Sequence, residues 1–268
     1  MIPNLARIKM NLCPLGPVGA GRAAFAVMFL VAWEAAGHTI FDPEFLSPPS
    51  AIIVAMPSLL SDPLILGALG QTLLQLAAAF ILAVVLGVAI GLLVGLHPVA
   101  SEASLPAILL AYSIPQVTIL PLFVLYFGVG AASKIAFGVT HGVFPILLSV
   151  IVGIKACDPE FIKVARSMGA SRHQIVRRII VPSMIPGLFS SFRVAMSACL
   201  LGVLLAELYA STGGVGYYAR LFSESFNPPA TFALVTILTT MAVLLNEAAR
   251  RLEIRASAWR TTNGGESI

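Results

Sequence analysis

Charged residues are scarce in this sequence. Lys, Arg, Asp and Glu make up 10% of the 268 residues, whereas an ordinary soluble domain carries about 25%. Hydrophobic residues make up 58% of the chain, and the mean hydropathy is +0.96. So few charges do not cover the surface of a soluble fold of this size. The composition argues against a soluble enzyme, a disordered tail and a nucleic-acid-binding domain, and it predicts a polytopic membrane protein.

Residues that bind metals, form disulfides or bind phosphate are also few. The three cysteines, Cys13, Cys157 and Cys199, are odd in number and lack the spacing of metal ligands. The four histidines are dispersed, so the clustered ligands of a membrane-embedded enzyme are missing. The phosphate-binding pattern G-x-x-x-x-G-K-[ST] is absent as well. We therefore expect no catalytic residue, no metal site and no cofactor bound by this chain.

Six stretches are long and apolar enough to cross the hydrocarbon core of a bilayer, which takes about 20 residues. They cover residues 23–41, 72–96, 103–127, 135–154, 184–206 and 230–246. No small-residue cleavage site follows the first stretch, so we interpret it as a retained signal anchor. The predicted fold is all-α, with six transmembrane helices.

The basic residues predict the orientation of these helices. Three precede the first stretch, six lie between the fourth and fifth, and four follow the sixth, which together makes 13 of the 16. Because six crossings place these segments on one side, and Lys and Arg mark the cytoplasmic side, both termini are expected in the cytoplasm. Only Lys134 and Arg220 fall on the opposite side, and Arg193 lies at a membrane boundary. We expect Arg193 to meet a lipid headgroup or an acid on a neighbouring helix.

These stretches define the expected segments of the chain. We expect a cytoplasmic segment over 1–22, a first transmembrane helix over 23–41, and a core of five transmembrane helices over 65–249. The connection 42–67 is rich in proline and acid, and we expect an extended or short-helical segment there. A cytoplasmic tail over 250–268 completes the chain.

The loop 155–183 is longer than a turn between two helices requires. Asp158 and Pro159 have the residue types of a helix N-cap and first helical position, and Gly169 has the type that ends a helix. Ser171 and Gln174 form the pattern of a capping box for a second helix, which Pro182 is expected to end. The first helix has a narrow apolar stripe of Phe161, Val164, Ala165 and Met168. Its apolar face either packs on this chain's own helices or is covered by another protein.

The same loop resembles the EAA motif of ABC importer permeases. The run from Val164 to Gly169 is followed, after nine intervening residues, by Ile179-Ile180-Val181-Pro182, and this is the spacing of that motif. Lys163 occupies the position of the motif's glutamate, and Val164 that of its first alanine. Further segments resemble the sulfonate, nitrate and taurine permease subfamily over roughly residues 47–255. They are 114–115, 120–123, 127–130, 144–146, 206–207 and 213–217.

The resemblance implies a type I ABC importer permease in a bacterial cytoplasmic (inner) membrane. Its implied partners are a separate ABC ATPase, which would bind ATP and Mg²⁺, an extracytoplasmic substrate-binding protein, a second permease copy and the surrounding membrane lipid, with no nucleic acid. The loop 155–183 would dock on the ATPase through six residues. These are Phe161, Val164, Ala165, Met168, Gly169 and Pro182. The implied solute is small. An organic anion or an oxyanion is expected, although the subfamily also handles uncharged or aromatic compounds and thiamine precursors.

Polar residues within the apolar stretches are candidates for a translocation pathway. Pro115 breaks the third stretch beside Ser113, Gln116 and Thr118, and broken helices at membrane depth line a cavity or are buried. These residues therefore line a pathway or form a packed kink. Glu207, at the end of the fifth stretch, lines a vestibule or caps a turn in the 213–216 loop. We expect Glu34 and His38 of the first stretch to pair locally or to reach the interface.

Glycines in the second stretch predict close helix packing. Gly87, Gly91 and Gly95 recur every four residues and therefore lie on one face, where small residues let helix backbones approach. They serve packing within the chain or a dimer interface. The alternative function is a self-sufficient secondary transporter or channel, which places ionisable residues within its spans and often has internal repeats. Two of the spans carry no charge, and the halves show no convincing repeat.

Overall fold

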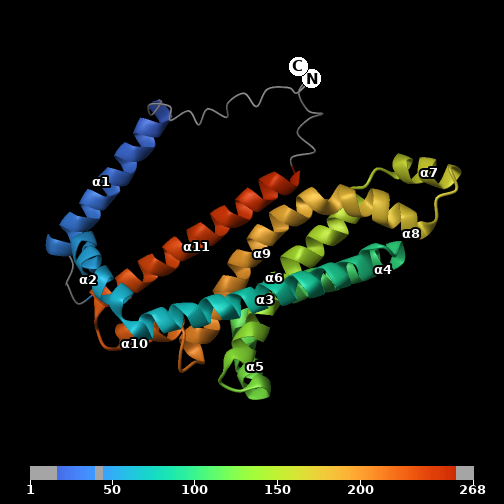
Figure 1. Ribbon diagram of the computed structural model, residues 1–268. Coiled ribbons are helices and arrows are strands. Elements are labelled where there is room, and N and C mark those ends of the chain that lie inside the picture. The colour runs from blue at the N-terminus through green and yellow to red at the C-terminus, as the bar shows by residue number, and fades with distance from the viewer. Residues whose placement is uncertain (1–16, 40–44, 258–268) are drawn as a thin grey trace.

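The computed structural model describes residues 17–39 and 45–257, and every regular element within these ranges is helical (Figure 1). Five of the described helices are long and apolar enough to cross a membrane, and a bent pair supplies a sixth span. The predicted all-α architecture is confirmed, and the described helices make six spans when the bent pair is counted as one. Residues 40–41 of the expected first span, and Arg7, Lys9 and Arg260 of the charge pattern, lie outside the described residues.

Three long helices form the core of the bundle. Helix α6 (Ala131–Lys155) packs along most of its length against both α3 (Pro63–Gly95) and α9 (Val181–Tyr209). Helix α3 begins nine residues before the expected span because Asp62 caps it, accepting a hydrogen bond from the Leu64 N–H at 2.8 Å. The buried side chains between the three helices are Leu76, Ala79, Ala83, Ile146, Val150, Met184, Ala195, Cys199, Leu200 and Val203.

The third span is broken into separate helices. Helix α4 (Pro98–Ser113) is followed by a 3₁₀ turn (Gln116–Ile119) and by α5 (Leu120–Phe127), and the two parts are bent by 81°. Pro115 disfavours helical backbone in the residue before it, and Ile114 is extended, with ψ at 130°. Because of this bend α5 projects from the bundle (Figure 1).

The second helix of the 155–183 loop does not end at Pro182, contrary to the sequence prediction. Helix α8 (Arg172–Ile175) continues through a π turn (Val176–Ile180) into α9, so that residues 172–209 form one helix. A proline inside an α-helix removes a hydrogen bond and collides with the carbonyl four residues before it. The wide turn that precedes Pro182, closed by the Val181 N–H on the Val176 carbonyl, accommodates the proline without ending the helix.

The remaining helices lie around this core. Helices α2 (Pro49–Ser61), α10 (Val215–Glu224) and α11 (Pro228–Ser257) share a second apolar cluster with α3, and α1 (Pro17–Thr39) contacts α2. Helix α11 continues past Asn246, the last residue of the expected sixth span. Helices α7 (Pro159–Ser167) and α8 lie at one end of the bundle, the α7 end, and α10 lies at the other, the α10 end (Figure 1).

Candidate functional site

Helix α7 is closed at both ends by local hydrogen bonds. Asp158 accepts one from the Glu160 N–H at 2.9 Å, and Pro159 is the first helical residue. At the other end the Ala170 N–H bonds to the Ala165 carbonyl at 3.0 Å, and the Gly169 N–H bonds to the Arg166 carbonyl at 3.0 Å. Gly169 has φ at +78°, which side chains with a Cβ rarely adopt. This is a Schellman cap, and it fixes where the chain leaves α7.

The chain then enters α8 through the predicted capping box. The Gln174 N–H donates to Ser171 Oγ at 3.3 Å, and the Ser171 N–H donates to Gln174 Oε1 at 2.8 Å. Only Ala170 separates the cap that ends α7 from the cap that begins α8. The 155–183 loop therefore has a defined geometry at the α7 end.

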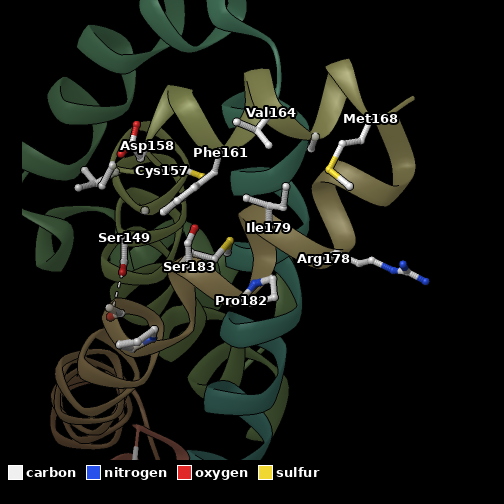
Figure 2. A pocket seen from close by; sticks show the side chains of 17 residues that line it. Ser149, Cys157, Asp158, Phe161, Val164, Met168, Arg178, Ile179, Pro182 and Ser183 are labelled. Atoms are coloured by element: carbon white, nitrogen blue, oxygen red, sulfur yellow. Dashed lines mark hydrogen bonds between the residues drawn. The ribbon is translucent and has the colours of Figure 1, made fainter. Parts of the chain in front are cut away.

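The apolar stripe of α7 is divided between the interior and the surface. Ala165 is half-buried and packs, together with Ile162, on the cluster of Cys157, Ile175 and Ile180. Phe161 is 63% exposed and Met168 82%, and Val164 is exposed as well. These three side chains border a cavity of about 1040 Å³ between α7, the end of α6 and the start of α9. Figure 2 shows the cavity with Ile179, Pro182 and Ser183 in its wall.

The polar residues of the broken third span lie on the surface of this chain. Ser113 Oγ donates to the Leu109 carbonyl at 2.8 Å, and Thr118 Oγ1 donates to the Pro115 carbonyl at 2.7 Å. Both hydroxyls are therefore bonded to their own helices, as a packed kink would have them. Gln116 differs, because its Oε1 is buried without a hydrogen-bond partner among the described residues.

The three glycines of α3 lie against α6 of the same chain. A Cβ atom added to Gly87 would lie 2.9 Å from Ile146 Cβ, and one added to Gly91 would lie 2.7 Å from Val150 Cβ. A Cβ atom on Gly95 would lie 2.6 Å from Ile154 Cδ1. These distances are shorter than ordinary van der Waals contacts. The close approach of α3 and α6 therefore requires glycine at Gly87 and Gly91, where Cβ atoms and backbone oxygens of α6 lie close, whereas at Gly95 the near atom is the end of the flexible Ile154 side chain.

Glu207 lies in the interior, between α9, α3 and the start of α10. It is 0% exposed, and Thr72 Oγ1 donates to its Oε1 at 2.8 Å. The Gly216 N–H donates to its Oε2 at 2.9 Å. The carboxyl group therefore holds the loop before α10 against α3, which agrees with the capping alternative more closely than with the vestibule.

Lys134, in the first turn of α6, is a buried cation that the charge pattern placed only at the far side of the membrane. Its side chain is 5% exposed, and its Nζ donates to the Gly213 carbonyl at 2.9 Å. Its burial depends on a loop 79 residues away in the sequence. No local pattern in the sequence indicated this burial, since a lysine beside an apolar stretch is expected to be solvated.

Two further ionisable groups of the spans, Arg193 and Glu34, lie close to a group of opposite or switchable charge. Arg193 Nη1 lies 3.8 Å from Glu253 Oε2, so an acid on the neighbouring helix α11 is within reach of this arginine, as one of the two alternatives predicts. Glu34 lies 3.0 Å from His38 Nε2, and it also accepts hydrogen bonds from Ser50 of α2, including one from the Ser50 N–H at 3.0 Å. Local pairing of Glu34 and His38 is therefore observed.

Comparison with known proteins identifies the family. Residues 83–255, more than half of the chain, match the family described as the binding-protein-dependent transport system inner membrane component. The chain belongs to this family. It is the permease component of a binding-protein-dependent ABC importer and crosses the inner membrane several times. This membership decides against the self-sufficient transporter or channel.

Curated relatives of this permease extend over nearly its whole length. It is 30% identical over 237 residues to the formylaminopyrimidine transport permease protein ThiX of Halalkalibacterium halodurans, a match that covers 88% of this chain and 94% of ThiX. It is 29% identical to the taurine transport system permease protein TauC of Escherichia coli, with 87% of each chain covered. A putative aliphatic sulfonates transport permease protein, SsuC of Bacillus subtilis, is 27% identical, with 89% of this chain and 87% of SsuC covered.

A solved structure supports the fold. A chain of the MetNI methionine ABC transporter in an inward-facing conformation superimposes with a TM-score of 0.64, covering 72% of this chain and 96% of that one. The two sequences are 19% identical, so this likeness concerns the fold alone. The type I importer permease fold expected from the sequence is thereby confirmed.

Proposed function

We propose that this permease forms the translocation pathway for a small organic anion or oxyanion and is coupled to a separate ATPase through the 155–183 loop. The observation that carries the coupling proposal is the geometry of α7. Its two caps fix the helix at one end of the bundle, while Phe161, Val164 and Met168 remain exposed beside an apolar cavity. Exposed apolar patches next to a rigid, polar-rimmed surface are typical of protein contacts. An ATPase that binds ATP and Mg²⁺ is the partner of this surface.

The pathway itself requires a second permease copy. The α4–α5 segment makes few contacts within the chain and exposes large apolar side chains, such as Leu110, Leu125 and Tyr126. A homodimer would cover this surface and place Gln116, together with Ser113, Pro115 and Thr118, near its symmetry axis. An extracytoplasmic binding protein would deliver the solute to the α10 end. The names of the taurine and aliphatic sulfonate relatives support a solute that carries a sulfonate group.

The coupling surface is tested by placing a charge on it. In Val164→Asp and Met168→Asp variants, we expect the ATPase to be lost from the purified complex, and ATP-dependent uptake into proteoliposomes to fall by about tenfold or more, because a buried unpaired carboxylate costs several kcal/mol. Both side chains are exposed in the permease alone, so its own fold is preserved. Ser167→Asp, which adds the same charge to α7 outside the apolar stripe, is the matched control.

Two outcomes would overturn the proposal. Full ATPase binding and uptake by both variants would show that α7 is not the docking surface. Equal loss in the Ser167→Asp control would show that the added charge, and not its position, is responsible. The mass of the intact complex tests the dimer, since two permease copies and two ATPase subunits are expected.

A further inference from the structure

A cavity with both polar and apolar lining lies at the α10 end of the bundle, far from the coupling loop. It has a volume of about 430 Å³ and lies between α3, the first turn of α6 and the loop that joins α9 to α10. Gln71, Gln75, Lys134, Thr212 and Gly213 supply its polar lining. The cavity therefore brings together three segments that are distant in the sequence.

Lys134 is the charged group of this cavity. Its ammonium has three N–H donors, and one hydrogen bond, to the Gly213 carbonyl at 2.9 Å, uses one of them. No acidic side chain forms an ion pair with Lys134 in the part of the chain that the structure describes. A buried cation is costly unless its charge and its donors are satisfied, and two of the three N–H donors of Lys134 have no hydrogen-bond partner among the described residues.

Two glutamines of α3 lie opposite the lysine. Gln71 and Gln75 are four residues apart and therefore share one face of the helix. Gln75 is 8% exposed, lines the cavity, and has an Oε1 atom with no hydrogen-bond partner among the described residues. A side-chain amide presents either its oxygen or its NH₂ group to a ligand. Both amides can therefore add N–H donors beside the lysine.

The acid nearest this loop, Glu207, is not among the residues that line the cavity. Its two oxygens accept hydrogen bonds from Thr72 and from the Gly216 N–H, and its carboxylate attracts the Lys134 ammonium electrostatically. The adjoining first turn of α6 adds the positive end of a helix dipole to the cavity wall. Among the described residues that line the cavity, the one charged side chain is therefore a cation.

We propose that this cavity binds the oxyanion group, a sulfonate or a carboxylate, of the transported solute, with Lys134 as its counter-ion and Gln71 and Gln75 as hydrogen-bond donors. This inference rests on the proposed function, because it assigns the anionic solute a first site within the permease. The charge pattern predicts that the α10 end faces away from the cytoplasm, so the solute meets this site before it crosses the membrane.

The test uses methanesulfonate as the probe and dimethyl sulfone as its neutral counterpart of similar shape. Thermal unfolding of the purified full-length permease is followed in detergent without ATP. We expect methanesulfonate to raise the Tm saturably, because a ligand that binds only the folded state stabilises it, and dimethyl sulfone to leave the Tm unchanged. In Lys134→Met the apparent Kd is expected to weaken by about tenfold or more, as loss of a charge-assisted hydrogen bond predicts.

Two further variants keep the test decisive. Gln75→Leu retains the lysine and is expected to weaken methanesulfonate binding severalfold, and it serves if Lys134→Met does not fold. Arg22→Met removes one positive charge from an exposed position on α1, and its methanesulfonate response is expected to match that of the wild type.

The inference is overturned by equal stabilisation from dimethyl sulfone, by an unchanged methanesulfonate response in Lys134→Met and Gln75→Leu, or by no response in the wild type. Because the measurement needs neither ATP nor an ATPase, its result is separable from the proposed function. A complex that imports a solute with ATP, but whose permease shows no sulfonate-dependent stabilisation, would retain the function and lose this site. Stabilisation that depends on Lys134, in a permease that binds no ATPase, would retain this site and contradict the proposed function.

Discussion

Thr72 of α3 and Glu207 of α9, 135 positions apart in the sequence, are joined by a hydrogen bond of 2.8 Å inside the helix bundle. The same Thr72 hydroxyl oxygen accepts a hydrogen bond from the Val215 N–H at 3.0 Å, and the Glu207 carboxyl accepts one from the Gly216 N–H at 2.9 Å. The pair therefore connects two core helices to the first turn of α10. Within this buried network the Thr72 hydroxyl, the Glu207 carboxyl and the two N–H groups are therefore hydrogen-bonded to one another.

Removing the Thr72 hydroxyl is expected to destabilise the bundle. The Thr72→Val variant keeps the shape of the side chain but leaves the Val215 N–H and one carboxyl oxygen without their partner. Because an unsatisfied buried group costs about 1–3 kcal/mol, we expect a loss of this size in the free energy of unfolding. Denaturant unfolding of the purified permease in detergent measures it.

A control variant and a double variant test whether the loss of stability comes from this hydrogen-bond network. Thr239→Val removes an exposed hydroxyl that bonds to its own helix, at the Val235 carbonyl, and it should leave stability nearly unchanged. The Thr72→Val and Glu207→Leu double variant should be less destabilised than the sum of the two single variants, since neighbouring residues in one network are coupled. Strict additivity would contradict this explanation.

The sequence predicted the local features of the site and missed those that depend on distant contacts. The caps at Asp158 and at Ser171 with Gln174 involve residues two or three positions apart, so their residue types alone identify them. The burial of Lys134 depends on the Gly213 carbonyl, 79 residues away, and no local pattern reports it. The expected end at Pro182 was wrong because a π turn keeps the helix continuous, and that turn has no clear sequence signal.

The approach of α3 to α6 should be sensitive to a single methyl group. In Gly91→Ala the added Cβ atom would lie 2.7 Å from Val150 Cβ, a branched and buried side chain that has little room to move. We expect a loss of about 1–3 kcal/mol in the free energy of unfolding, the usual cost of overpacking. Denaturant unfolding in detergent is again the measurement.

A second glycine on the same helix supplies the matched control. Nothing lies within 4 Å of a Cβ atom added to Gly70, so Gly70→Ala should be neutral or stabilising by up to about 1 kcal/mol, because alanine favours the helix. Equal destabilisation by the two substitutions would indicate a general effect on α3, and the packing explanation would then be wrong.

The ion pair between α9 and α11 should contribute little. Arg193 and Glu253 are 3.8 Å apart, with side chains 40% and 23% exposed, and solvent screens such a pair. We expect Arg193→Ala to lower the free energy of unfolding by no more than about 1 kcal/mol. The charge-exchanged Arg193→Glu and Glu253→Arg double variant should restore the wild-type value. A loss of several kcal/mol in Arg193→Ala would show that the arginine makes further contacts.

Gly169 allows its backbone conformation to be separated from its size. A Cβ atom added there meets nothing within 4 Å, but φ is +78°, a conformation that costs a β-branched residue about 1–2 kcal/mol. We expect Gly169→Val to loosen the end of α7 and to reduce ATP-dependent uptake, with little change in the Tm of the whole bundle. Gly169→Asn should retain most uptake, because asparagine adopts positive φ more readily. Equal loss of uptake in both variants would mean that this position must be free of any side chain against the ATPase, and that the conformation of the cap is not what coupling requires.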